Sequence, residues 1–384
     1  MLTRIIPKAL RYSLVTWLFI SWTSVMTFTT VSYARTSTIK HDGHLDEVAS
    51  QHLQQILTEP DRATIDAVGT QLRAAGLADA QILPFATVGT TATSIESAFE
   101  TFRDETAKVR EMTHYGIARH IDKESSRNVL VAIFSRRLVS SSKFPSTVSE
   151  KALTIPLYPS VEHKIRDADI EGFLESPNGK IRRIPIERNW LSGQAELRIQ
   201  FADGPGRYVF EIMVDNDRGP EASLLWTFSM GVSEKQHSKA PEDLLLPDDK
   251  STLLALVHRS RLGANVKPLT EDRRLSLAAH EYAQNVCRTL IAAHITPQGQ
   301  TAADRAQQHG YRGPLAENVA IAQTVGRAHQ NILQSPSHKY NLISSTFTHI
   351  GIGIASRKAQ AKSSAFDKRP NRTWCVVQLF GLVR

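Results

Sequence analysis

In the last third of the chain, apolar residues recur at helical spacing and then change to short strand-like runs. Leu275, Ala278, Ala279 and Ala283 fall on one face of a helix, and three further segments repeat a helical pattern. Helices followed by strands predict an α+β domain whose helices cover a small antiparallel sheet. The predicted helices are 253–257, 275–286, 302–309 and 325–333, and the predicted strands are 350–355 and 374–379.

The middle of the chain has the pattern of a β domain. Six short β-rich runs follow one another, and Asn178-Gly179 between two of them is a strong hairpin signal. This spacing predicts an immunoglobulin-like sandwich that serves as a spacer or a binding module. Asp215-Asn216-Asp217 fits a calcium ligand cluster or an exposed turn, and we interpret it as a turn. The predicted strands are 152–158, 168–174, 180–186, 195–201, 207–214 and 223–230.

The N-terminus has the three parts of a secretory signal. Arg4, Lys8 and Arg11 precede an apolar stretch over 13–31, and Ser32-Tyr33-Ala34 is an A-x-A-like cleavage site. We expect residues 1–34 to be removed, the alternative being a retained anchor. No other stretch approaches the roughly 20 apolar residues of a transmembrane helix. The mature protein is therefore expected to be secreted, periplasmic or at the cell surface.

Composition and charge narrow the classes of partner. The 384 residues carry a net charge of +8, and removal of the three basic residues of the leader leaves +5. This mild excess favours anionic envelope polymers or lipid surfaces. Zinc-finger spacing and interleaved aromatic and basic residues are missing, so we do not expect nucleic acid as a partner. The two cysteines, Cys287 and Cys375, are open to a disulfide in an exported protein or to two buried thiols.

Several short motifs occur in a fixed order in the C-terminal third. Together they resemble the CAP superfamily, also called the SCP/TAPS domain, in its bacterial form, over the run from Leu253 to Arg384. The motifs that carry the resemblance are Leu253–Arg261, His294-x-x-Pro297-x-Gly299, Asp304-Arg305, Gly310-Tyr311, Glu317-Asn318-Val319-Ala320, Ser335-Pro336-x-His338, His349-Ile350-Gly351-Ile352-Gly353 and Phe380-Gly381.

The resemblance implies an α-β-α sandwich with a surface cleft lined by two histidines and two acidic residues. Carried over by position, His294, Glu317 and His338 fill three of these places. The fourth place, where many members have glutamate, falls at Gln334, which is neutral and cannot act as a general base. This departure argues against chemistry that needs the complete set.

The residue types alone allow three roles for His294, Glu317 and His338. Two neutral imidazoles, His294 and His338, suit a divalent transition ion such as zinc, with Glu317 and water completing the coordination. The same groups could perform general acid–base chemistry, since histidine titrates near neutral pH. The third use is structural, a buried network that ties loops together.

The front of the mature chain echoes the C-terminal domain. Leu45, Val48, Ala49 and Leu53 repeat the helical spacing seen from Leu275 onward, and 113–118 parallels 348–353. We interpret residues 40–138 as a degenerate CAP-like copy without counterparts of the two histidines and the glutamate. Pro84 falls near the glutamate position. The alternative is an unrelated α+β domain with a similar strand.

These observations predict four segments: a signal peptide over 1–34, a degenerate CAP-like domain over 40–138, a β-sandwich over 145–235 and a CAP domain over 245–384. We expect an envelope-associated or secreted bacterial protein that binds an envelope, lipid or peptide ligand through its His/Glu cleft without catalysis. The alternative is a metal-dependent hydrolase of peptide or cell-wall material. Against this alternative, the signatures G-x-S-x-G and H-E-x-x-H do not occur.

Overall fold

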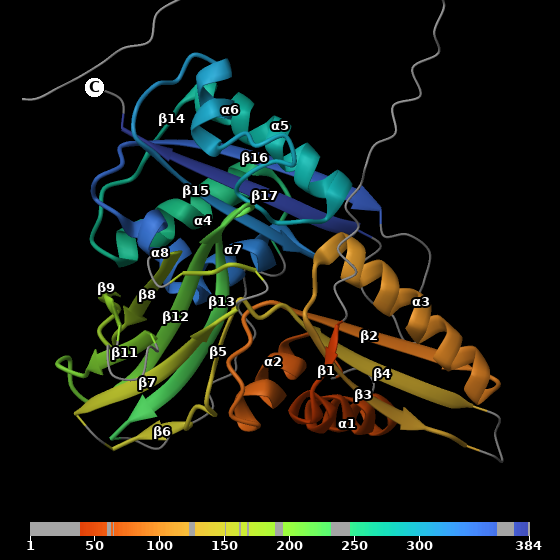
Figure 1. The fold of residues 1–384 in the computed structure, drawn as a ribbon. Helices are drawn as coiled ribbons and strands as arrows, with labels where there is room; N and C mark the ends of the chain where they lie inside the picture. The colour runs from red at the N-terminus through yellow and green to blue at the C-terminus, as the bar shows by residue number, and fades with distance from the viewer. Residues whose placement is uncertain are drawn as a thin grey trace, which may run out of the picture. The chain divides into compact units, whose positions relative to one another are not determined.

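Four small sheets and the helices packed on them make up the described part of this chain (Figure 1). The structure is a computed structural model that describes residues 39–59, 63, 65–122, 127–149, 151–160, 163–166, 169–188, 195–231, 246–358 and 372–382. The expected signal peptide over 1–34 lies outside these residues. None of the helices within the described ranges combines the length and apolar character needed to cross a bilayer.

The first module combines three helices with one sheet, in which the strand order is β1-β3-β4-β2. Leu45, Val48 and Leu53 of the first helix are buried against the central strand, as their helical spacing predicts. The second face is covered by the third helix through Ile95 and Phe99. The elements are β1 (Lys40–His41), α1 (Gly43–Thr58), α2 (Ile65–Ala74), β2 (Ile82–Gly89), α3 (Ala92–Arg110), β3 (His114–His120) and β4 (Asn128–Ser135).

Two sheets then pack face to face around one apolar core, which forms the central β-sandwich. Residues from both sheets meet there, including Leu157, Leu197 and Phe210. The strand orders are β10-β11-β7-β5 and β6-β13-β12-β8-β9. All six runs expected to be strands are strands, with bounds that differ by a few residues. The elements are β5 (Val139–Ser141), β6 (Thr147–Val148), β7 (Ala152–Pro159), β8 (Ile170–Glu175), β9 (Ile181–Ile184), β10 (Ile186–Arg188), β11 (Ala195–Gln200), β12 (Gly206–Asn216) and β13 (Gly219–Met230).

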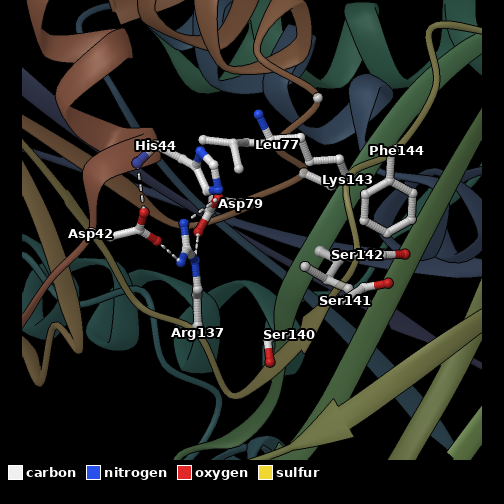
Figure 2. A pocket seen from close by; sticks show the side chains of 13 residues that line it. Asp42, His44, Leu77, Asp79, Arg137, Ser140, Ser141, Ser142, Lys143 and Phe144 are labelled. Carbon is white, nitrogen blue, oxygen red and sulfur yellow. Dashed lines mark hydrogen bonds and ion pairs between the residues drawn. The ribbon is translucent and has the colours of Figure 1, made fainter.

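A hollow of about 220 Å³ lies where the first module meets the sandwich. Figure 2 shows Arg137 on one of its walls, pointing between the carboxylates of Asp42 and Asp79. Arg137 donates hydrogen bonds to both carboxylates, and the one from Nη2 to Oδ2 of Asp79 measures 3.1 Å. The charges of Arg137, Asp42 and Asp79 are therefore paired with one another, which ties the start of α1 and the segment before β2 to the end of β4.

The C-terminal domain has three layers. Its sheet has the order β14-β16-β17-β15, and the central strand β17 directs Cys375, Val377 and Leu379 to one face and Val376 and Phe380 to the other. On the first face lie α5 and α6, and on the second lie α4, α7 and α8. The elements are α4 (Lys250–Gly263), β14 (Thr270–Glu271), α5 (Arg273–Thr289), α6 (Ala302–Gln308), β15 (Leu315–Ala322), α7 (Val325–Gln334), α8 (Pro336–Ile343), β16 (His349–Lys358) and β17 (Arg372–Gly381).

Glycine is required where α5 crosses β16. A Cβ atom on Gly351 would lie 2.1 Å from the carbonyl carbon of Leu275, so only glycine lets the backbones approach this closely. The first module repeats the geometry, since a Cβ on Gly116 would lie 2.1 Å from the carbonyl carbon of Leu45. The close helix–strand contact explains why His-Ile-Gly-Ile-Gly and His-Tyr-Gly-Ile occur at corresponding places.

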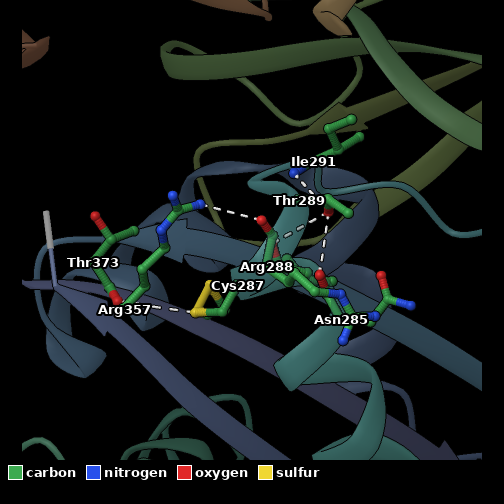
Figure 3. Close-up of a disulfide and its surroundings, with 9 residues drawn as sticks. Asn285, Cys287, Arg288, Thr289, Ile291, Arg357 and Thr373 are labelled. Atoms are coloured by element: carbon green, nitrogen blue, oxygen red, sulfur yellow. Dashed lines mark hydrogen bonds between the residues drawn. A yellow bond between two sulfur atoms is a disulfide. The ribbon is translucent and has the colours of Figure 1, made fainter. Parts of the chain in front are cut away.

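A disulfide joins the helical layer to the sheet. Cys287 of α5 and Cys375 of β17 are bonded, with 5.5 Å between their Cα atoms and a separation of 88 positions in the sequence (Figure 3). Nearby, the Arg357 side chain donates a 3.1 Å hydrogen bond to the carbonyl of Arg288, at the same end of α5. The sequence left open whether the two cysteines pair, and the fold brings them into bonding geometry.

Candidate functional site

Three of the predicted site residues lie together in the C-terminal domain. His294, in the loop between α5 and α6, bonds through Nδ1 to Oε1 of Glu317 on β15, at 2.8 Å. The ring of His338, in the first turn of α8, has its centroid 6.3 Å from that of His294. Residues from three separate parts of the chain therefore form one cluster, which we call the His/Glu cluster.

The position of Glu317 follows from the register of β15. Glu317 pairs with Leu379 of β17, which pairs in turn with Gly351 of β16. The side chain of Glu317 is 4% exposed, and its second oxygen, Oε2, accepts a 2.5 Å hydrogen bond from Nη2 of Arg305. Both carboxylate oxygens are therefore engaged, one by an imidazole and one by a guanidinium.

Arg305 is a site residue whose role the sequence did not reveal. Its guanidinium lies 3.5 Å from the ring centroid of Tyr282, and its Nη1 donates to the carbonyl of His294. The hydroxyl of Tyr282 donates a 2.6 Å hydrogen bond to the carbonyl of Ala293, next to His294. Burial, followed by the nearby charge of Glu317, raises the pKa of Tyr282 to about 12, so this hydroxyl keeps its proton. The signal that the sequence offered for Arg305 was the Asp304-Arg305 motif, which is one of those that carry the family resemblance.

His338 lies on α8, a helix that is not among those predicted from the sequence. Ser335 caps the N-terminus of α8 by accepting from the amide of His338, and Pro336 occupies the first turn, where its missing N–H costs nothing. The helix is short and mostly polar, so its apolar spacing is too weak to predict it. Asn318, buried beside Glu317, donates from Nδ2 to the carbonyl of His338 at 3.0 Å and so ties β15 to α8.

The two imidazoles differ in their surroundings. Burial, followed by the nearby charge of His294, lowers the pKa of His338 to about 3, so His338 is neutral at physiological pH. His294 is oriented by the Glu317 carboxylate, which can only accept, so a hydrogen on Nδ1 faces it. At neutral pH the cluster therefore offers the uncharged imidazole of His338 beside the ion pair of Glu317 and Arg305.

Gln334, the fourth predicted position, is four residues before His338 in the chain. It is the last residue of α7 and is exposed, directly before the cap residue Ser335. Being neutral, it adds a hydrogen-bonding amide rather than a carboxylate. Of the two positions that the resemblance implies to be acidic, only Glu317 is therefore acidic in this sequence.

The cluster does not fit a zinc site with three protein ligands. His294 and His338 are close enough to approach one ion, but Glu317 is bonded through both oxygens to His294 and Arg305. Among the residues that the structure describes, no group of three His, Cys, Asp or Glu side chains is arranged to hold a metal ion. The arrangement suits hydrogen bonding to a polar ligand.

Comparison with known proteins places the cluster within a family. Residues 254–380 match the model of the cysteine-rich secretory protein family, CAP. The C-terminal domain is a CAP domain. This confirms the resemblance seen in the motifs, and all four positions predicted for the cleft, His294, Glu317, Gln334 and His338, lie inside the matched range. No curated protein matches the chain.

Solved structures similar to the chain include extracellular and surface proteins. An outer surface protein of Borrelia burgdorferi is 23% identical with a TM-score of 0.29, and the match covers 38% of this chain and 97% of that one. An extracellular SCP-domain protein of Bacillus anthracis is 15% identical with a TM-score of 0.28, covering 64% and 67%. A cysteine-rich secretory protein of Staphylococcus aureus is 13% identical with a TM-score of 0.24, covering 63% and 85%.

Proposed function

We propose that this protein is a secreted or envelope-associated bacterial binding protein whose CAP domain holds a ligand at the His/Glu cluster without chemical turnover. The observation that carries the proposal is the pairing of Glu317 on both oxygens, with His294 and with Arg305. A carboxylate held in this way orients an imidazole, but it is poorly placed to take a proton from water or to bind a metal ion.

The charge state of the cluster indicates the kind of ligand. His338 is neutral, and the charge of Glu317 is balanced by Arg305. A neutral ligand rich in hydrogen-bond donors, such as the peptide or glycan part of wall material, suits this surface better than a phosphate headgroup does. The disulfide between Cys287 and Cys375 supports export, because such bonds persist in oxidising compartments.

The upstream modules complete the proposal. We propose that residues 1–34 are a cleaved signal, that 145–235 form an immunoglobulin-like spacer, and that 40–138 are a degenerate CAP-like copy. The copy is supported by its sheet order β1-β3-β4-β2, which matches β14-β16-β17-β15, and by the register of β2. Pro84 pairs with Ile133, which pairs with Gly116, so Pro84 occupies the place that Glu317 has in the CAP domain.

Binding can be tested by co-sedimentation with two probes, purified peptidoglycan sacculi and phosphatidylglycerol vesicles. We expect the mature protein to sediment with sacculi, and His294→Ala or His338→Ala to weaken this at least tenfold. His280→Ala is the matched control, since His280 is an exposed histidine on α5 of the same domain. Binding that survives loss of both cluster histidines would refute the proposal. Sacculi that release soluble fragments only with intact His294 and His338 would establish the hydrolase alternative instead.

A further inference from the structure

One hairpin of the central sandwich contacts both segments that carry the cluster histidines. The hairpin consists of β12 and β13 with Asp217 and Arg218 at its tip. At the tip, the carbonyl of Arg218 accepts from the amides of His294 and Ile295, both at 2.9 Å. A Cβ atom on Gly219, the next residue, would lie 2.8 Å from the Cβ of His294. The tip therefore lies directly against the first histidine.

The same strand also holds the helix of the second histidine. Glu211, on β12 and 1% exposed, accepts from the amide of Ser337 at 2.7 Å and from the hydroxyl of Ser335 at 2.8 Å. These two donors belong to the N-terminus of α8, where a carboxylate is favourably placed. Burial raises the pKa of Glu211, and its hydrogen bonds with Ser337 and Ser335 oppose that rise. Both bonds join the sandwich to the CAP domain.

Further contacts secure α8 to the neighbouring strand of the sandwich. Lys339 forms an ion pair with Glu175 of β8 at 2.5 Å, and the ring of Tyr340 lies 6.1 Å from that of Phe173. Arg183 of β9 lies 5.6 Å from both ring centroids. Lys339 and Tyr340, the two residues that follow His338 on α8, therefore both contact the sandwich.

The hairpin is anchored in turn to the first module. Arg218 pairs with Glu221 at 2.9 Å, Glu221 pairs with Arg136 at 3.0 Å, and Arg136 pairs with Glu111 at 2.7 Å. Arg136 and Glu221 are almost fully buried. These ion pairs link the tip to the first module while it lies against His294, so a shift of the tip would have to break or rearrange them.

From these contacts we infer that the β12–β13 hairpin is a lid on the His/Glu cluster, which must shift before a ligand reaches His294 and His338. The inference deepens the proposed binding function, on which its biological meaning rests, by adding regulation of the same site by the sandwich. Side-chain exposures of 14% for His294 and 4% for Glu317 agree with a closed state. The hairpin would then exchange between a closed form, which predominates, and a less populated open form, which alone binds the ligand.

Access to the imidazoles can be measured without a ligand. Diethyl pyrocarbonate modifies neutral, accessible imidazole, and peptide mass spectrometry reports each histidine separately. Because His338 is neutral, slow modification of it would report shielding rather than charge. In the mature wild-type protein we expect His294 and His338 to react much more slowly than the exposed His280.

Two variants should open the lid. Glu211→Ala removes both acceptors at the α8 N-terminus, and we expect about tenfold acceleration at His338, because loss of the two hydrogen bonds weakens the closed form. Gly219→Ala brings a methyl group against His294 and should accelerate its modification. Gly179→Ala is the matched control, because Gly179 has a similar positive φ of +80° in the β8–β9 hairpin but would place its Cβ with no atom within 4 Å.

The lid is refuted if His294 and His338 react as fast as His280 in the wild type, or if Glu211→Ala and Gly219→Ala leave both rates unchanged. If Glu211→Ala fails to fold, the buried His52 and His329 will also react with the reagent. Glu211→Gln, which keeps an acceptor oxygen, is then used in place of Glu211→Ala. For this milder variant we expect a smaller acceleration at His338 alone. Since the reagent reports access and the sacculi report binding, the lid and the proposed function can fail separately.

Discussion

Removing Arg305 should test how the His/Glu cluster is held together. Arg305→Ala leaves the Glu317 carboxylate buried with His294 as its remaining partner. The side chains of Arg305 and Glu317 are 8% and 4% exposed, which places their ion pair in the buried class, where loss of one partner costs about 3–5 kcal/mol of unfolding free energy. The stack on Tyr282 is lost as well, so we expect the upper half of this range.

A double variant gives a second test. In a Glu317→Gln background, where no buried charge is stranded, Arg305→Ala should cost about 1–3 kcal/mol less. Arg274→Ala is the control, because Arg274 pairs with Asp272 but is 44% exposed and should contribute far less.

Urea unfolding of the purified mature protein, followed by tryptophan fluorescence and circular dichroism, measures these differences. The reasoning is refuted if Arg305→Ala costs less than about 1 kcal/mol, which is the range of exposed ion pairs. It is also refuted if the loss is the same in the Glu317→Gln background, because the two residues would then not be coupled.

Three further predictions concern the same domain. Replacing Cys287 and Cys375 together by serine should lower the unfolding free energy by about 4–5 kcal/mol, given the 88-residue separation, and reductant should have no further effect on this variant. The lowered pKa of His338 means that its contribution to stability is present above about pH 6.5 and is lost as the pH falls toward 3, so His338→Gln should flatten the acid limb of a plot of stability against pH. Residues 245–384 produced alone should give a soluble fragment with one cooperative thermal transition, and a fragment that is unfolded with its disulfide intact would contradict this domain boundary.

The elements that could be predicted from the sequence are those whose patterns are local. The apolar face of α5 and the Asn178-Gly179 turn each lie within one window of the chain and were read correctly. The strand β15 was missed because its run, Leu315–Ala322, is rich in alanine and interrupted by Glu317 and Asn318. The helix α8 was missed because capping by Ser335 and contacts with the sandwich stabilise it rather than an apolar stripe.

In the candidate site, too, some residues could be predicted from the sequence and others could not. His294, Glu317 and His338 were identified because the motifs around them resemble a known family, whereas spacing alone could not bring together residues that are 23 and 21 positions apart. The role of Arg305 depends on its stack over Tyr282 and its contact with Glu317, which involve three different elements. The contact of Arg218 with His294 crosses two modules, and such long-range pairings leave no periodic signal in either one.

Pro84 has a consequence for how the protein behaves at high concentration. It lies on β2, at the edge of the first module's sheet, where a strand presents unpaired backbone groups that another chain could extend. Proline has no N–H, and within sheets it is accommodated in edge strands where its nitrogen faces solvent rather than the neighbouring strand. The third residue of β2 therefore offers no donor to a strand of another chain, and we expect this to weaken edge-to-edge pairing of the first module's sheet.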